Sequence, residues 1–84
     1  MNYVFHSEAY AEFKHAVDCY ESCSLGYDFA VEVYSTIEQI VAYPKAWVIL
    51  EKEVRRCQTR KFTYGVPYAE EPEGICMRRH QHQL

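Results

Sequence analysis

The first half of the chain repeats its apolar residues with the period of an α-helix. Ser7 is a favourable N-cap at the start of this stretch, and Glu8 suits the first helical turn. Apolar positions then recur three and four residues apart, which is the stripe that an amphipathic helix buries. They are Tyr10, Phe13, Ala16 with Val17, and Tyr20. The pattern predicts a helix with one apolar face.

A second helix is predicted by the same period. Its stripe consists of Phe29 with Ala30, Val33, Ile37, and Ile40 with Val41. Residues 24–26 separate the two helices, and we expect Gly26 to adopt a left-handed conformation there. The helix is expected to stop at Tyr43, because a residue that precedes proline is driven out of the α region. Two amphipathic helices with so short a connection predict an antiparallel hairpin.

Shorter apolar runs predict strands on either side of this hairpin. They lie at residues 3–5, 54–60, 61–68 and 75–77, with a turn at 70–74 that is rich in glutamate, proline and glycine. Residues 46–50 are too few for a stable helix, and Trp47 within them is expected to cover an edge of the core. Because neither helix can bury its stripe alone, both should lie on the sheet. The predicted fold is α+β, in the order β-α-α-β-β-β.

Length and composition agree with one soluble domain over residues 1–84. The longest apolar run, residues 46–50, is far too short to span a membrane. The N-terminus has neither the basic region nor the apolar stretch of a signal peptide. The four cysteines are therefore expected to be reduced thiols in a cytoplasm.

The charge of the chain is unevenly distributed. Residues 1–51 carry two lysines against eight acidic residues, a net charge of −6, whereas residues 52–84 carry seven basic against four acidic residues, a net charge of +3. A local positive charge within an acidic chain indicates an anionic partner for one face. The basic residues are Lys52, Arg55, Arg56, Arg60, Lys61, Arg78 and Arg79.

Six of these seven, all except Lys52, are the predicted target- or nucleic-acid-binding residues. Arginine suits such a role because its guanidinium places two N–H groups on two phosphate oxygens. Arg56, Gln58 and Arg60 would project from one face of an unbroken strand. The alternative is a solvated strand face whose charges protect an edge from pairing.

Aromatic residues alternate directly after the basic ones. Phe62 is expected in the core, and Tyr64 and Tyr68 either join it or act at a site. Cleavage of RNA without a metal requires a base near the 2′-hydroxyl and cations at the phosphate. Arg60, Tyr64 and Tyr68 are the candidates for such chemistry, and the sequence leaves the catalytic residues unknown.

Histidines and cysteines form two further groups. His15, Cys19 and Cys23 share one helical face, but the outer two are about 12 Å apart along the helix axis. They cannot share one ion, so we predict no metal and no cofactor. Cys57 and Cys76 are expected to pack within strands. His80, in the atypical tail at 78–84, is either part of a site or a polar end.

Several of these motifs together resemble the RelE/ParE superfamily of toxins from bacterial type II toxin–antitoxin modules, the class also associated with plasmid stabilisation. The resemblance covers residues 1 to about 75. It rests on residues 5–9, 20–21, 26–29, on Ile37 with Ile40, on Tyr43-Pro44 with Ala46-Trp47, and on the run from Arg55 to Tyr68.

The resemblance implies a small twisted antiparallel sheet with the helical hairpin packed on one face. Members of the superfamily inhibit growth either by cutting mRNA on the ribosome without a metal or by poisoning DNA gyrase. An antitoxin that wraps the toxin silences both kinds. The cognate antitoxin, and either the ribosome with its mRNA or DNA gyrase, are therefore the implied partners.

Two departures from the superfamily pattern shape the functional hypotheses. Gly65 stands where ribosome-dependent members place a catalytic arginine, and residues 75–77 look like a truncated last strand. The leading hypothesis is a toxin that acts by binding through its basic strand face. The alternatives are a ribosome-dependent mRNA endoribonuclease, and a degenerate, non-toxic member that only binds or forms a homodimer through an exposed sheet edge.

Overall fold

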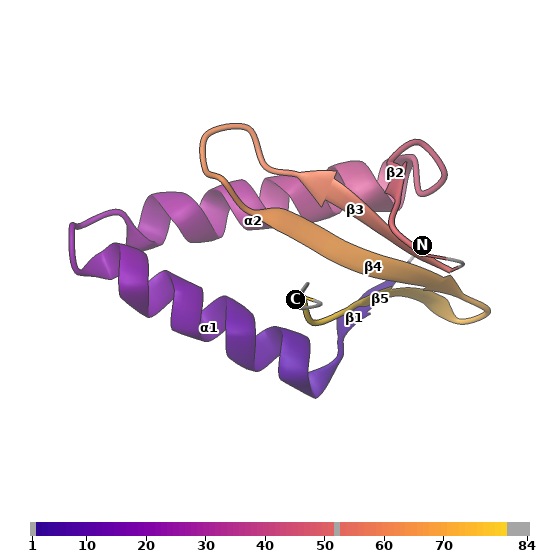
Figure 1. The fold of residues 1–84 in the computed structure, drawn as a ribbon, viewed down its shortest axis with the longest axis horizontal. Helices are drawn as coiled ribbons and strands as arrows, with labels where there is room; N and C mark the ends of the chain where they lie inside the picture. Colours follow the sequence, from indigo (N-terminus) through magenta and orange to yellow (C-terminus); the bar gives the residue numbers. More distant parts are fainter. Residues whose placement is uncertain (1, 52, 81–84) are drawn as a thin grey trace.

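The computed structural model describes residues 2–51 and 53–80, which form a helical hairpin beside one sheet (Figure 1). The elements are β1 Tyr3–Phe5, α1 Ser7–Glu21, α2 Gly26–Ala42, β2 Val48–Ile49, β3 Val54–Gln58, β4 Gly65–Glu71 and β5 Gly74–Met77. The predicted α+β fold is confirmed. Lys52 and residues 81–84 of the expected tail lie outside the described residues.

The five strands form one mixed sheet in the order β1-β5-β4-β3-β2. Strands β2 to β5 pair antiparallel with their neighbours, whereas β1 pairs parallel with β5. The sheet is thus not antiparallel throughout. Consecutive strands joined by a tight turn must run antiparallel. β1 and β5 are joined by the rest of the fold instead, so they can run parallel.

The start of α1 differs from the prediction by one residue. The N-cap is His6, not Ser7, because the Nδ1 atom of His6 accepts the backbone N–H of Glu8 at 3.2 Å. The end of α2 is as predicted, since the helix stops at Ala42 and Tyr43 leaves the helical conformation before Pro44.

The turn between the helices uses different residues from those expected. Ser24, with φ of 64°, is the left-handed residue, and Gly26 is already the first residue of α2. A side chain at residue 26 would collide with the Glu21 carboxylate and would lie 3.0 Å from the Val17 carbonyl oxygen. Gly26 therefore allows the ends of the two helices to approach closely.

The strands β3 and β4 are separated by a loop that the sequence did not reveal. Thr59 is buried, and its Oγ1 lies within hydrogen-bond distance of the carbonyl oxygens of Phe62, at 2.7 Å, and Tyr64, at 2.9 Å, while its backbone N–H donates to Tyr64. These bonds close residues 59–64 into a compact loop. The strands predicted at 54–60 and 61–68 therefore do not meet: β3 ends at Gln58 and β4 begins at Gly65. Glu70 and Glu71 belong to β4, and the turn is confined to Pro72-Glu73.

The last strand, β5, is short but fully paired within the sheet. β5 lies between β1 and β4, and its Ile75 and Met77 are 1% exposed. Among the described residues, the edges of the sheet are therefore β1 and the short, unpredicted β2, and neither edge results from a missing last strand.

The core lies between α2 and the sheet. Its fully buried side chains come from both layers and are Phe29, Val33, Ile37, Ile40, Tyr68, Ile75 and Met77. Phe62 packs at 4.9 Å from Tyr20 and 5.3 Å from Phe29, centroid to centroid, as expected of a core residue. Cys57 and Cys76 are buried in their strands, as predicted. Within the part of the chain that the structure describes, no helix has the length and apolar character needed to cross a membrane.

Candidate anion-binding cleft

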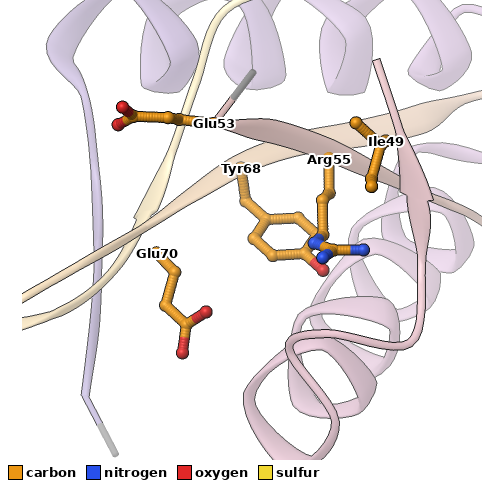
Figure 2. A pocket seen from close by; sticks show the side chains of 5 residues that line it. All are labelled: Ile49, Glu53, Arg55, Tyr68 and Glu70. Atoms are coloured by element: carbon orange, nitrogen blue, oxygen red, sulfur yellow. The ribbon is translucent and has the colours of Figure 1, made fainter. Parts of the chain in front are cut away.

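The six predicted binding residues divide into two groups, and Arg55 belongs to the structural one. Its Nη1 atom donates to the carbonyl oxygens of Lys45 at 3.1 Å and Trp47 at 2.9 Å. Arg55 pairs across the sheet with Tyr68, and both line a cavity of about 270 Å³ together with Ile49, Glu53 and Glu70 (Figure 2). Arg55 thus holds the segment before β2 against the sheet.

Arg78 and Arg79 are engaged by carboxylates. Nη2 of Arg78 lies 2.8 Å from Oε2 of Glu71, and Nε of Arg79 lies 3.0 Å from Oε1 of Glu8. An ion-paired guanidinium must exchange its protein partner for a ligand before it can bind one. These two arginines are therefore weaker candidates than their charge suggested.

Arg56, Arg60 and Lys61 form the second group, which we call the free cations. All three side chains are exposed, and among residues 2–51 and 53–80 no carboxylate lies within ion-pairing distance of them. Arg56 is in β3, whereas Arg60 and Lys61 lie in the loop after it. The expected single row of Arg56, Gln58 and Arg60 is broken, because β3 ends at Gln58.

Arg56 lines the most spacious hollow among those lined by predicted binding residues, a cleft of about 700 Å³. Helix α1 forms one wall of it, and β3, the 59–64 loop, β4 and the residues after β5 form the rest. The lining residues are Glu12, His15, Arg56, Gln58, Thr63, Tyr64, Gly65 and His80. Arg60 instead lines a separate cavity of about 280 Å³ beside α2, and Gln58 contributes to both. Two of the free cations, Arg56 and Arg60, therefore line different cavities.

His80 closes one side of this cleft. Its backbone N–H donates to Oε1 of Glu12 at 2.8 Å, and its Nδ1 lies 3.1 Å from the same oxygen. Its Nε2 lies 2.6 Å from the carbonyl oxygen of Gly65. Both ring nitrogens thus face acceptors, and only the imidazolium form can donate to both.

The contact between His80 and Glu12 was not predicted from the sequence, because the two residues are 68 positions apart. His80 is held against α1 and β4 and is therefore not a free polar end, whereas its role in a site stays a prediction. Among the described residues that line the cleft, Glu12 is the only one with a carboxylate, and that carboxylate already contacts His80. The remaining lining side chains are neutral or cationic.

Tyr64 is half-buried in the wall of the cleft. Its ring packs against His80 and Phe29, with centroids at 4.8 and 4.9 Å. Burial, followed by the charge of Glu12, raises the pKa of Tyr64 to about 12. The hydroxyl is therefore protonated at neutral pH and cannot serve there as a general base.

Tyr68 is a core residue. Its side chain is fully buried, and its hydroxyl donates to the carbonyl oxygen of Pro44. Burial raises its pKa to about 12, against a smaller lowering effect of Arg55. The candidates Arg60, Tyr64 and Tyr68 thus occupy three separate environments and do not form one catalytic group.

His15 and Cys19 are neighbours on the exposed side of α1, with Nε2 and Sγ 3.6 Å apart. The Cys23 thiol donates instead to the carbonyl oxygen of Tyr20. Among the described residues, no three His, Cys, Asp or Glu side chains are placed to hold a metal ion together.

Comparison of the chain with protein-family models and with curated proteins finds no match to either.

Proposed function

We propose that this chain is a toxin-like component of a type II toxin–antitoxin module, which acts by binding an anionic target through its free cations. The observation that carries the proposal is that the side chains of Arg56, in β3, and of Arg60 and Lys61, in the loop after it, are exposed and outside ion-pairing distance of every carboxylate among residues 2–51 and 53–80. Side chains of this kind neutralise phosphates without first giving up a partner.

The target that fits this surface best is RNA, as in a ribosome-bound mRNA. Arg56 offers a fork of N–H groups that suits phosphate, and the cleft around it is walled by polar and aromatic side chains. DNA gyrase is the alternative target, and a preference for an acidic protein surface over RNA would favour it. The proposed compartment is the cytoplasm, where the four free thiols would remain reduced.

An antitoxin is the second partner in this proposal. An acidic antitoxin segment would be attracted to the same free cations. The edge strand β2 offers backbone groups for pairing, and its Val48 and Ile49 are 62% and 61% exposed. An extended antitoxin segment laid along this edge would cover both side chains.

Expression in a bacterial host without antitoxin tests the proposal. We expect growth arrest with the unmutated chain and its loss with the triple variant Arg56→Ala, Arg60→Ala and Lys61→Ala. The matched control removes three cations that have internal partners: Lys14, which lies over the Tyr10 ring, Lys45, paired with Glu70, and Arg79, paired with Glu8. Undiminished growth with the unmutated chain, at confirmed expression, contradicts an active toxin.

A second candidate function is ribosome-dependent cleavage of mRNA. The observation that favours it is that His15, Arg56, Tyr64 and His80 line one cleft. Histidine exchanges protons near neutral pH, and an arginine beside it stabilises the negative charge that develops on a phosphate. We expect cleavage to be lost in His15→Ala and Arg56→Ala, whereas intact mRNA on ribosomes with the unmutated protein excludes this activity.

The third possibility, a non-toxic member that only binds or dimerises, has support in the edge strands. β1 and β2 each have one unpaired side, and a second copy can extend a sheet at such an edge. Light scattering at high concentration separates this case, since a strict monomer contradicts dimerisation through an edge.

A further inference from the structure

Gly65 lies beneath the side chain of Arg56. In the register of the sheet Gly65 pairs with Gln58, and Arg56 is two residues away on the same face of β3. A Cβ atom at residue 65 would lie 2.7 Å from Cγ of Arg56 and nearer still to Cδ. The aliphatic part of Arg56 therefore occupies the space that any other side chain at residue 65 would fill.

The backbone does not require glycine at this position. Among the described glycines only Gly74 has a positive φ, so the conformation of Gly65 is open to other residues. Glycine in a strand costs stability, because it has no side chain to pack and loses more entropy on folding. Glycine at residue 65 is therefore needed for space: the absence of a side chain lets the Arg56 side chain lie across this position.

We infer that Gly65 and Arg56 together form a subsite for a phosphate oxyanion, in which Gly65 positions Arg56 across the floor of the cleft. This inference rests on the proposed function, because it names the chemical group that the cleft takes from its target. Gln58, Thr63 and His15 line the same cleft and supply further donors. The one carboxylate there, Glu12, already accepts from His80 and repels the anion less than a free carboxylate would.

A double-mutant cycle tests the inference, with fluorescence anisotropy of a short single-stranded oligoribonucleotide as the readout. Loss of a charged hydrogen bond lowers affinity by roughly tenfold or more, so we expect this from Arg56→Ala. Gly65→Ala should weaken binding to a similar degree, because the new methyl group displaces the Arg56 stem. The double variant should bind no worse than Arg56→Ala alone.

Arg60→Ala provides the control, since Arg60 lies outside this cleft. It should weaken binding by the same factor in the unmutated and the Gly65→Ala backgrounds. Inorganic phosphate, added as a competitor, should displace the oligoribonucleotide from the unmutated protein more effectively than from Arg56→Ala. Displacement by phosphate that is the same in both proteins overturns a phosphate subsite at Arg56.

The remaining outcomes are distinct from one another. Unchanged affinity in Gly65→Ala together with weak binding in Arg56→Ala overturns the positioning role of Gly65. Unchanged affinity in Arg56→Ala with a loss in Arg60→Ala overturns the subsite and leaves the proposed function standing. Absence of binding by the unmutated protein removes both.

Folding of the variants is followed by thermal melting. If Gly65→Ala fails to fold but the double variant folds, the collision with Arg56 is demonstrated, because truncation of Arg56 relieves it. If both fail to fold, glycine at residue 65 serves the backbone or another neighbour, and the positioning role is overturned.

Discussion

Arg55 and Arg56 are adjacent in the sequence and lie on opposite sides of β3. Arg55 shares a side with the buried Cys57 and donates to two backbone carbonyls, whereas Arg56 is exposed above Gly65. Successive side chains of a strand point to opposite faces of the sheet. Arg55 therefore stabilises the segment before β2, whereas Arg56 is exposed. Local positive charge in the sequence was therefore an unreliable guide to which arginines have exposed side chains without ion-pair partners among the described residues.

Truncation of each arginine in turn separates the structural role of Arg55 from the exposed position of Arg56. Arg55→Ala leaves the carbonyl oxygens of Lys45 and Trp47 without their donor and should lower the free energy of unfolding by about 2 kcal/mol. Arg56→Ala should change it by less than about 0.5 kcal/mol, because its side chain is exposed and forms no ion pair with the described carboxylates. Urea denaturation measures both, and equal effects contradict the division.

High pH tests the buried side of the sheet through Tyr68. Its hydroxyl ionises near pH 10 in the unfolded chain and near 12 in the folded protein, so the unfolded state loses its proton first. Stability should therefore fall as pH rises from 10 towards 12, and at pH 11 the contribution of Tyr68 is a loss of about 1 kcal/mol.

The matched variant is Tyr68→Phe, compared with the unmutated protein by urea denaturation at pH 8 and pH 11. The difference between the two proteins should be smaller at pH 11 than at pH 8, because the variant has no hydroxyl to ionise. An unchanged difference means that the folded protein tolerates the ionised hydroxyl, and Tyr68 is then not held as the structure shows.

Salt dependence sharpens the comparison between free and paired cations. Each phosphate neutralised by a cation contributes about 0.7 to the slope of log affinity against log salt for a single strand. Arg56→Ala, Arg60→Ala and Lys61→Ala should each reduce the slope by about this amount. Arg79→Ala should leave it unchanged, because Arg79 is paired with Glu8. A reduction with Arg79→Ala would extend the binding surface to the end of the described chain.

The smallest expected effect concerns the stability that this ion pair contributes. Arg79 and Glu8 are each 60% exposed. A double-mutant cycle with Arg79→Ala and Glu8→Ala should give a coupling energy below about 0.5 kcal/mol. A larger coupling would mean that the pair fastens the residues after β5 to α1, and Arg79 would then join Arg55 as a structural residue.

The candidate site was predictable only in part. Arg56, Arg60 and Tyr64 were chosen from the sequence, and two of them, Arg56 and Tyr64, line the cleft. The sequence does not show which carboxylates pair with Arg78 and Arg79, because ion pairing depends on which segments the fold brings together. Glu12 carried no signal, since an acid on the polar face of a helix is ordinary.

The sequence by itself determined the local structure: two amphipathic helices, the stop before Pro44, an apolar last strand and a cationic second half. These features depend on residue spacing and backbone sterics, which act within a few positions of the chain. Only the tertiary structure decided the 59–64 loop, the parallel pair of β1 with β5, and the joining of Glu12, Gly65 and His80. Contacts of that kind arise between residues far apart in sequence, where packing of the whole core selects one arrangement among many that local pattern allows.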